Sequence, residues 1–147
     1  MNEGKKEIIV AASGYFDPIH VGHIEYLKMA KSLGDKLVVI INNDSQAKLK
    51  KGKPFMPQEE RAKIIGALKF VDGVFLSIDQ DSSVCKSIEF LKPNIFAKGG
   101  DRFNYEIPES EVCRRYNIKI IDGLGEKIQS SSWLIERSKN EPNKNLK

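Results

Sequence analysis

Five short apolar runs recur along the chain, and none shows the polar alternation typical of half-exposed strands. Strands of this kind are buried on both faces, as in a parallel sheet covered by helices. The runs predict strands over Glu7–Ser13, Lys36–Ile41, Gly73–Ser77, Asn94–Ala97 and Ile118–Ile121.

Amphipathic stretches lie between these runs and predict helices. Their ranges are Gly22–Leu33, Gln58–Phe70, Ser82–Leu91 with Ser82 or Ser83 as its cap, Glu109–Tyr116 and Ser130–Ser138. The alternation of strand and helix predicts an α/β fold, with a Rossmann-like, doubly wound parallel sheet of five strands and right-handed crossovers. We expect one domain over residues 1–138, followed by a flexible tail over 139–147 that lacks apolar residues until Leu146.

Composition excludes several classes of protein. No apolar run approaches the roughly 18 residues of a membrane helix, and the N-terminus lacks the pattern of a secretory signal. Cys85 and Cys113 are far apart and match no metal-ligand spacing, which favours idle thiols in a reducing cytosol. We therefore expect a cytoplasmic protein with no protein-bound metal and no membrane partner.

The net charge is +4, spread mostly as lysine, and the densest cluster is formed by Lys48, Lys50, Lys51 and Lys53. Such a cluster is most often a solvated face, and it can also bind nucleic acid or a polyphosphate. No aromatic residue is interleaved with these lysines, as a single-strand binder would prefer, so we expect no nucleic-acid partner.

The loop after the first predicted strand combines two glycines with both histidines of the chain. In open α/β sheets, ligands bind beyond the carboxyl ends of the strands, where this loop lies. Gly14 allows close approach to a bound group, and Gly22 opens a helix whose free N–H groups favour an anion. His20 and His23, in H-x-G-H spacing, could each donate a hydrogen bond to a phosphoryl oxygen. The alternative is that they are ordinary surface or core residues.

This loop resembles the signature G-x-F-D-x-x-H-x-G-H of the cytidylyltransferase-like family of nucleotidyltransferases, and the resemblance extends from about Ile8 to Ile135. It implies attack by a phosphorylated small-molecule acceptor on the α-phosphate of a nucleoside triphosphate, with Mg²⁺ accompanying the nucleotide and no covalent intermediate. A homodimer is implied in the same way. The loop residues assigned by the resemblance are His20 and His23 as catalytic groups and Gly14, Tyr15, Phe16, Asp17 and Gly22 as nucleotide-binding groups.

The resemblance also assigns residues outside the first loop. Lys51 occupies the place of a lysine that reaches the triphosphate from a flexible loop, with Lys53 as a helper. Arg61 aligns with a family arginine at the nucleotide; otherwise it would aid helix solubility and pair with Glu60 or Asp72. Asp44 is predicted to contact the acceptor.

Two later segments complete the predicted site. Lys98-Gly99-Gly100-Asp101-Arg102 ends a strand and is either a plain turn or a ligand contact, with Gly100 and Asp101 at the nucleotide and Arg102 at the acceptor. Near the C-terminus, the serines Ser130, Ser131 and Ser132 resemble the family's phosphate-binding helix start, and Lys127 is the candidate substitute for a nearby family arginine that this sequence lacks.

The acceptor is open at this level. The K-G-G-D stretch resembles the adenylyltransferase of ADP-heptose synthesis, which favours ATP and a sugar phosphate such as heptose 1-phosphate. Cytidylyl transfer from CTP to glycerol 3-phosphate or another alcohol phosphate, and adenylyl transfer to FMN, are the enzymatic alternatives. A nucleotide-binding regulatory domain is the alternative outside enzymology, although it would not need both histidines and Lys51.

Overall fold

The computed structural model describes residues 7–99 and 107–124. Its five strands form one parallel sheet in the order β3-β2-β1-β4-β5. Their bounds are Ile9–Gly14 for β1, Lys36–Ile41 for β2, Gly73–Leu76 for β3, Ile95–Gly99 for β4 and Lys119–Leu124 for β5. The predicted doubly wound sheet is confirmed, and β1 lies at its centre.

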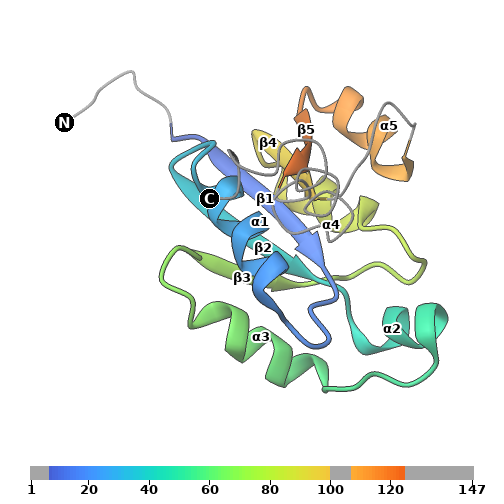
Figure 1. The fold of residues 1–147 in the computed structure, drawn as a ribbon. Helices are drawn as coiled ribbons and strands as arrows, with labels where there is room; N and C mark the ends of the chain where they lie inside the picture. Colours follow the sequence, from blue (N-terminus) through green and yellow to red (C-terminus); the bar gives the residue numbers. More distant parts are fainter. Residues whose placement is uncertain (1–6, 100–106, 125–147) are drawn as a thin grey trace, which may run out of the picture.

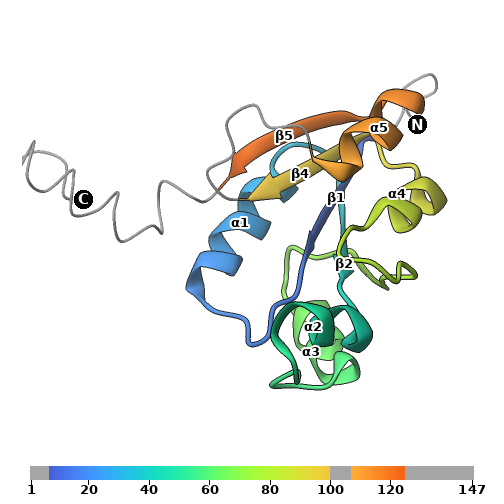
Figure 2. The same cartoon turned by 90° about the vertical axis from the view of Figure 1, so that its right-hand side faces the viewer.

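Five helices connect the strands: α1 (Val21–Lys31), α2 (Asp44–Lys51), α3 (Gln58–Gly66), α4 (Cys85–Leu91) and α5 (Pro108–Arg115). The helices α1 and α3 cover one face of the sheet, and α4 and α5 cover the other (Figures 1 and 2). Within the described residues, no helix has the length and apolarity needed to cross a membrane.

The sheet is buried on both faces, as its apolar runs predict. On the α1 and α3 side, Leu27 and Ile65 pack against strand residues that include Val10 and Val39. On the opposite side, Ile88 and Val112 belong to a second core cluster with Ala11, Ile40 and Phe96. Each cluster buries large aliphatic side chains, and this burial stabilises the fold by about 25 cal/mol per Å² of apolar surface removed from water. The helices are thereby held against the sheet, and the layers in turn position the ends of the strands.

Most predicted boundaries are within three residues of those observed. The helix predicted over Gln58–Phe70 ends at Gly66, although Leu68 and Phe70 still pack against the core beyond its end. The helix predicted from Ser82 begins at Cys85. Serine is not its main cap, because the Asp79 carboxylate accepts from the N–H groups of Lys86 and Ser87 at 2.7 and 2.9 Å.

The prediction of a flexible loop after the second strand is wrong, because the segment Asp44–Lys51 is the helix α2. Asn43 and Gln46 form a capping box, in which each side chain accepts a hydrogen bond from the other residue's backbone N–H. The Asn43 amide also donates to the carbonyls of Ser77 and Asp79, which anchors the start of α2 to the loop after β3. Lys48 and Lys50 therefore extend from a helix.

A first prediction concerns Gly34, which follows α1. A Cβ added there would lie 2.7 Å from Val10 Cγ2 and 2.8 Å from the Ile8 carbonyl oxygen. Because backbone cannot yield as a flexible side chain can, Gly34→Ala should lower the free energy of unfolding by about 1–3 kcal/mol in urea denaturation. The matched control is Gly66→Ala, whose Cβ would meet Val74 Cγ2 at an ordinary 3.4 Å and should leave stability unchanged or raised. Equal effects of the two changes would contradict this account.

Candidate active site

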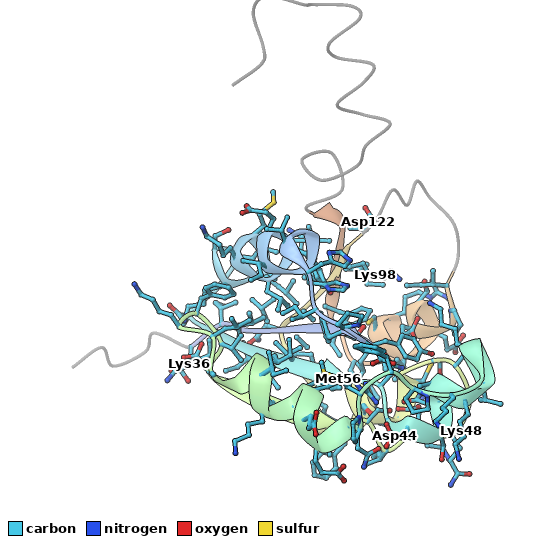
Figure 3. All side chains as sticks on the ribbon, turned by 60° about the horizontal axis from the view of Figure 1, so that its bottom comes forward. Lys36, Asp44, Lys48, Met56, Lys98 and Asp122 are labelled. Atoms are coloured by element: carbon cyan, nitrogen blue, oxygen red, sulfur yellow. The ribbon has the colours of Figure 1, made fainter. Side chains whose placement is uncertain are left out.

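The candidate site lies at the carboxyl ends of the parallel strands. Asp44, Lys48, Met56 and Lys98 all lie at the end of the molecule opposite Lys36, which begins β2 (Figure 3). The loops that follow β1 and β2 meet there, and β4 ends at the same edge. This is the edge at which open α/β sheets bind their ligands.

The two histidines form a stacked pair at the start of α1. Their ring centroids are 3.8 Å apart and the rings are inclined by 23°. His20 is the N-cap of the helix, and its Nδ1 accepts from the N–H of Gly22 at 3.1 Å. His23 Nδ1 accepts from the backbone N–H of His20 at 3.1 Å. The H-x-G-H spacing thus forms a capping box made of two imidazoles.

This capping box fixes which ring nitrogen can donate. A nitrogen that accepts a hydrogen bond carries no proton, so a neutral ring in this geometry holds its proton on Nε2. Both Nε2–H groups are then donors that the cap itself does not use. The expectation that the first-turn N–H groups are free for an anion is wrong for Gly22 and His23, since Gly22 donates to His20 Nδ1 and His23 to the His20 carbonyl.

The His23 ring is held neutral by its surroundings. Burial, together with a smaller effect of the nearby His20, lowers the pKa of His23 to about 4. The edge of the ring meets Phe16, with centroids 4.9 Å apart and an interplanar angle of 74°. At neutral pH, His23 is therefore an uncharged donor, suited to a phosphoryl oxygen whose negative charge grows during attack.

Gly14 serves the protein's own packing. A Cβ on Gly14 would lie 2.8 Å from Phe16 Cζ, so the missing side chain makes room for that ring. Phe16 is 2% exposed and has a φ of 52°, in the left-handed region that disfavours a residue with a Cβ. The signature glycine and phenylalanine together place an aromatic edge against His23.

Arg61 ties three loops together from inside the protein. It is 1% exposed and donates to the carbonyls of Tyr15, Asn42 and Met56 at 2.9, 2.7 and 2.9 Å. Its Nη2 forms an ion pair with Asp44 at 2.7 Å. The alternative of pairing with Glu60 or Asp72 is wrong, because the guanidinium points into the protein and Asp72 instead pairs with Lys31.

Asp17 joins the first loop to the segment before α3. Its two carboxylate oxygens accept from the backbone N–H groups of Phe55 and Met56 at 2.8 and 2.7 Å. The signature aspartate thereby fixes the distance between the histidine loop and the chain that carries Arg61. Its predicted contact with a nucleotide stays a prediction.

Lysines border the site on the α2 side. The Nζ of Lys50 lies 4.7 Å above the centre of the Tyr15 ring, a cation–π contact. Burial raises the pKa of Tyr15, against the opposing effect of Arg61. Lys48 and Lys53 are exposed. The backbone places Lys51 at the end of α2, and its side chain lies outside the described part of the structure.

Several predicted site residues lie outside the described residues, and their roles stay predictions: Gly100, Asp101, Arg102, Lys127, Ser130, Ser131 and Ser132. Among residues 7–99 and 107–124, no group of three or more His, Cys, Asp or Glu side chains could hold a metal ion.

The sequence reasoning missed the residues that support the first loop and α2. Gln46 is fully buried, and its amide donates to the carbonyls of Asp81 and Ser83 at 2.7 and 2.8 Å. The N-x-x-Q spacing of Asn43 and Gln46 is a capping signature that could have revealed α2. The contacts of the Tyr26 hydroxyl with the backbone of Ser13 and Ala97 were also missed, because a tyrosine at this position in a helix looks like an ordinary core residue.

Fold and site together define a nucleotide-binding α/β protein with two imidazole donors at the mouth of its first helix. The chain belongs to the cytidylyltransferase-like family, whose model matches residues 11–137. It is a nucleotidyltransferase, as the relatives are. The family's substrates are a nucleotide and a phosphorylated acceptor.

Relatives of two kinds are similar to this chain. The FAD synthase of Pyrococcus abyssi is 43% identical over 100 residues, which cover 67% of either chain. The bifunctional protein HldE of Nitratiruptor sp. is 36% identical over 131 residues, 88% of this chain and 27% of that protein. This chain therefore spans about a quarter of the length of the HldE protein.

A solved structure agrees with the fold. The lipopolysaccharide core biosynthesis protein from Thermoplasma volcanium superposes with a TM-score of 0.66 and 34% sequence identity. The match covers 80% of this chain and 96% of that one. The similarity thus extends over nearly the whole of the solved protein.

Removal of the Arg61 side-chain charge should destabilise the protein strongly. Arg61→Met would leave three carbonyls and Asp44 without their donor, and we expect a loss of about 3–5 kcal/mol in chemical denaturation. The control is Arg115→Met on α5, because the Arg115 side chain is 53% exposed and pairs with Glu111 at 3.7 Å. Its loss should stay below about 1 kcal/mol. Similar losses for the two variants would show that the Arg61 contacts contribute little.

The lowered pKa of His23 makes stability depend on pH. Between the ordinary pKa of 6.5 and the folded value of about 4, the unfolded chain binds a proton that the folded protein excludes. The free energy of unfolding should therefore have its full value above about pH 6.5 and decrease as the pH drops toward about 4. Denaturation at a series of pH values should show a smaller fall for His23→Gln. Identical pH profiles would refute a buried neutral ring.

Proposed function

We propose that the chain transfers the NMP part of a nucleoside triphosphate, with ATP favoured, to a sugar phosphate such as heptose 1-phosphate, and releases pyrophosphate. The observation that supports this is the stacked pair of imidazoles whose Nδ1 atoms are both occupied by backbone N–H groups. Two Nε2–H donors in rings 3.8 Å apart match neighbouring oxygens of one phosphate chain. The similarity to HldE favours the sugar phosphate.

The proposed reaction is an in-line displacement. An oxygen of the acceptor phosphate forms a bond to the α-phosphorus, and the bond from that phosphorus to the bridging oxygen of the β-phosphate breaks. The electron pair leaves with pyrophosphate. The His20 and His23 donors stabilise charge on the phosphoryl oxygens, and Lys51 and Lys53 contribute positive charge beside the leaving group. No side chain needs to act as a nucleophile.

Mg²⁺ belongs to the proposal as the counter-ion that enters with the nucleotide. It would neutralise charge on the triphosphate when bound. A homodimer, a cytoplasmic location and the lack of a nucleic-acid partner likewise remain predictions.

FMN is a second candidate acceptor. The similarity to FAD synthases covers about two thirds of this chain at 43% identity, as strong as the similarity to HldE. FMN also presents a phosphate monoester as the attacking group, so the same site chemistry would serve. The sugar phosphate and FMN differ in the group that carries this phosphate, so they would need different binding pockets around it.

Pyrophosphate release from a matrix of substrates tests the proposal. The purified chain is incubated with each of ATP, CTP, GTP and UTP and with heptose 1-phosphate, FMN or glycerol 3-phosphate. Release with ATP and heptose 1-phosphate is the expected result, and release with FMN alone would move the assignment to the second candidate. Nucleotide retained without turnover would indicate a regulatory domain, and no nucleotide binding would end the proposal.

Substitutions of His23 test the donor directly. His23→Ala should lower kcat about 10²–10³-fold, since one transition-state donor is lost. The matched variant His23→Gln places an amide N–H near the position of Nε2 and should retain more activity than His23→Asn, whose shorter side chain does not reach it. Turnover of folded His23→Ala at the wild-type rate would remove His23 from the mechanism.

A further inference from the structure

The Tyr26 hydroxyl on α1 lies between two strands that border the candidate site. Tyr26 is 7% exposed, and its hydroxyl donates to the Ala97 carbonyl of β4 at 2.7 Å. The same oxygen accepts from the Ser13 N–H of β1 at 3.1 Å and lies 3.3 Å from the Ser13 carbonyl oxygen. Burial raises the pKa of Tyr26, so the hydroxyl stays protonated as this donor bond requires.

The two strands part at the position of this hydroxyl. The pairing of β1 with β4 ends at Ala12 and Ala97. The pairing of β1 with β2 continues in register as far as Gly14, and β4 stays paired with β5 as far as Gly99, with a register shift between Ala97 and Gly99. β1 therefore separates from β4 at the residues where β4 also shifts its register against β5. In the order β3-β2-β1-β4-β5 the space between β1 and β4 is the switch point of the sheet, where a crevice for ligands opens.

The Tyr26 ring fills the adjoining space. A Cβ added to Gly99 would lie 3.2 Å from Tyr26 Cδ1, so the ring packs directly against the end of β4. Its hydroxyl and ring thus contact both strands at the point of separation. Lys98, from the end of β4, lies on the α1 side of the molecule in Figure 3.

We propose that Tyr26 is a positioning residue, whose hydroxyl holds β1 and β4 apart at their carboxyl ends and so keeps open the crevice that admits the nucleotide. The role of the crevice rests on the proposed function. Without the hydroxyl, the backbone groups of Ser13 would need another partner, and the next pair in register, Ser13 with Lys98, would supply it. The pairing of β1 with β4 would then extend by one residue pair, and the crevice between them would narrow.

The histidines should be little affected by this closure. Their orientation depends on the capping box at the first turn of α1, through Gly22 N–H and His20 N–H, and Tyr26 takes no part in it. Loss of the hydroxyl should therefore raise the KM for nucleotide and leave kcat nearly unchanged. A merely structural role would instead reduce the fraction of active enzyme, which lowers apparent kcat and leaves KM as it was.

The test compares Tyr26→Phe with Tyr116→Phe. The Tyr116 hydroxyl also donates a hydrogen bond, to Glu89 Oε2 at 2.9 Å, on the α4 and α5 side of the sheet. For Tyr26→Phe we expect the KM for ATP, and the dissociation constant measured by calorimetry, to rise about tenfold with kcat within about threefold. Tyr116→Phe should keep both values.

A second readout needs no nucleotide. Cross-strand nuclear Overhauser effects between Ser13 and Lys98 should appear in Tyr26→Phe and be weak or lacking in the wild-type protein. If these effects do not appear, or if they appear while ATP binds as before, the proposal is overturned. Should the wild-type protein fail to use any nucleotide, the proposed function fails, and the Overhauser effects alone decide whether Tyr26 separates the strands.

Discussion

The buried guanidinium of Arg61 is the contact on which the geometry of the candidate site depends. Loops at the carboxyl end of a parallel sheet have few backbone partners of their own, and carbonyls that turn inward there need donors. Arg61 supplies them to Tyr15, Asn42 and Met56 at once, and Asp44 balances its charge. An arginine suits this task because its planar fork presents several donors in fixed directions. The loops after β1 and β2 are thereby held as one unit.

The imidazole pair follows the part of the first loop that Arg61 holds through the Tyr15 carbonyl. Because each Nδ1 is engaged by a backbone N–H, the same hydrogen bonds that cap α1 also select the Nε2–H tautomer of a neutral ring. Phe16 and partial burial keep His23 uncharged, so the site offers donors with little fixed positive charge from this ring. The lysines on and after α2 complement it with mobile charge. Donation and charge are thus supplied by different elements, which allows each to be tested by its own substitutions.

The fold could be predicted from the sequence because apolar runs and amphipathic stretches indicate the secondary structure of the segments in which they occur. β2 was located to the residue, and the other strands and helices follow one another in the predicted order, with α2 the helix that was not predicted. Such local patterns could not predict contacts between residues that are far apart in the sequence. Arg61 bonds to carbonyls 46 and 19 residues away, so nothing near it in the chain reveals that it is buried. The packing of the Phe16 ring against Gly14 was not predicted either, since a positive φ at Phe16 leaves no local signature in the sequence.

The central claim is that the two histidines present Nε2–H donors to a nucleoside triphosphate. Nitrogen-15 NMR of the imidazole rings tests it most directly, with and without a non-hydrolysable ATP analogue. The account predicts an unprotonated Nδ1 and a protonated Nε2 in both rings of the free protein, and a shift of both Nε2–H signals when the analogue binds. A proton on Nδ1 of either ring, or Nε2–H signals that do not respond to bound nucleotide, would contradict it.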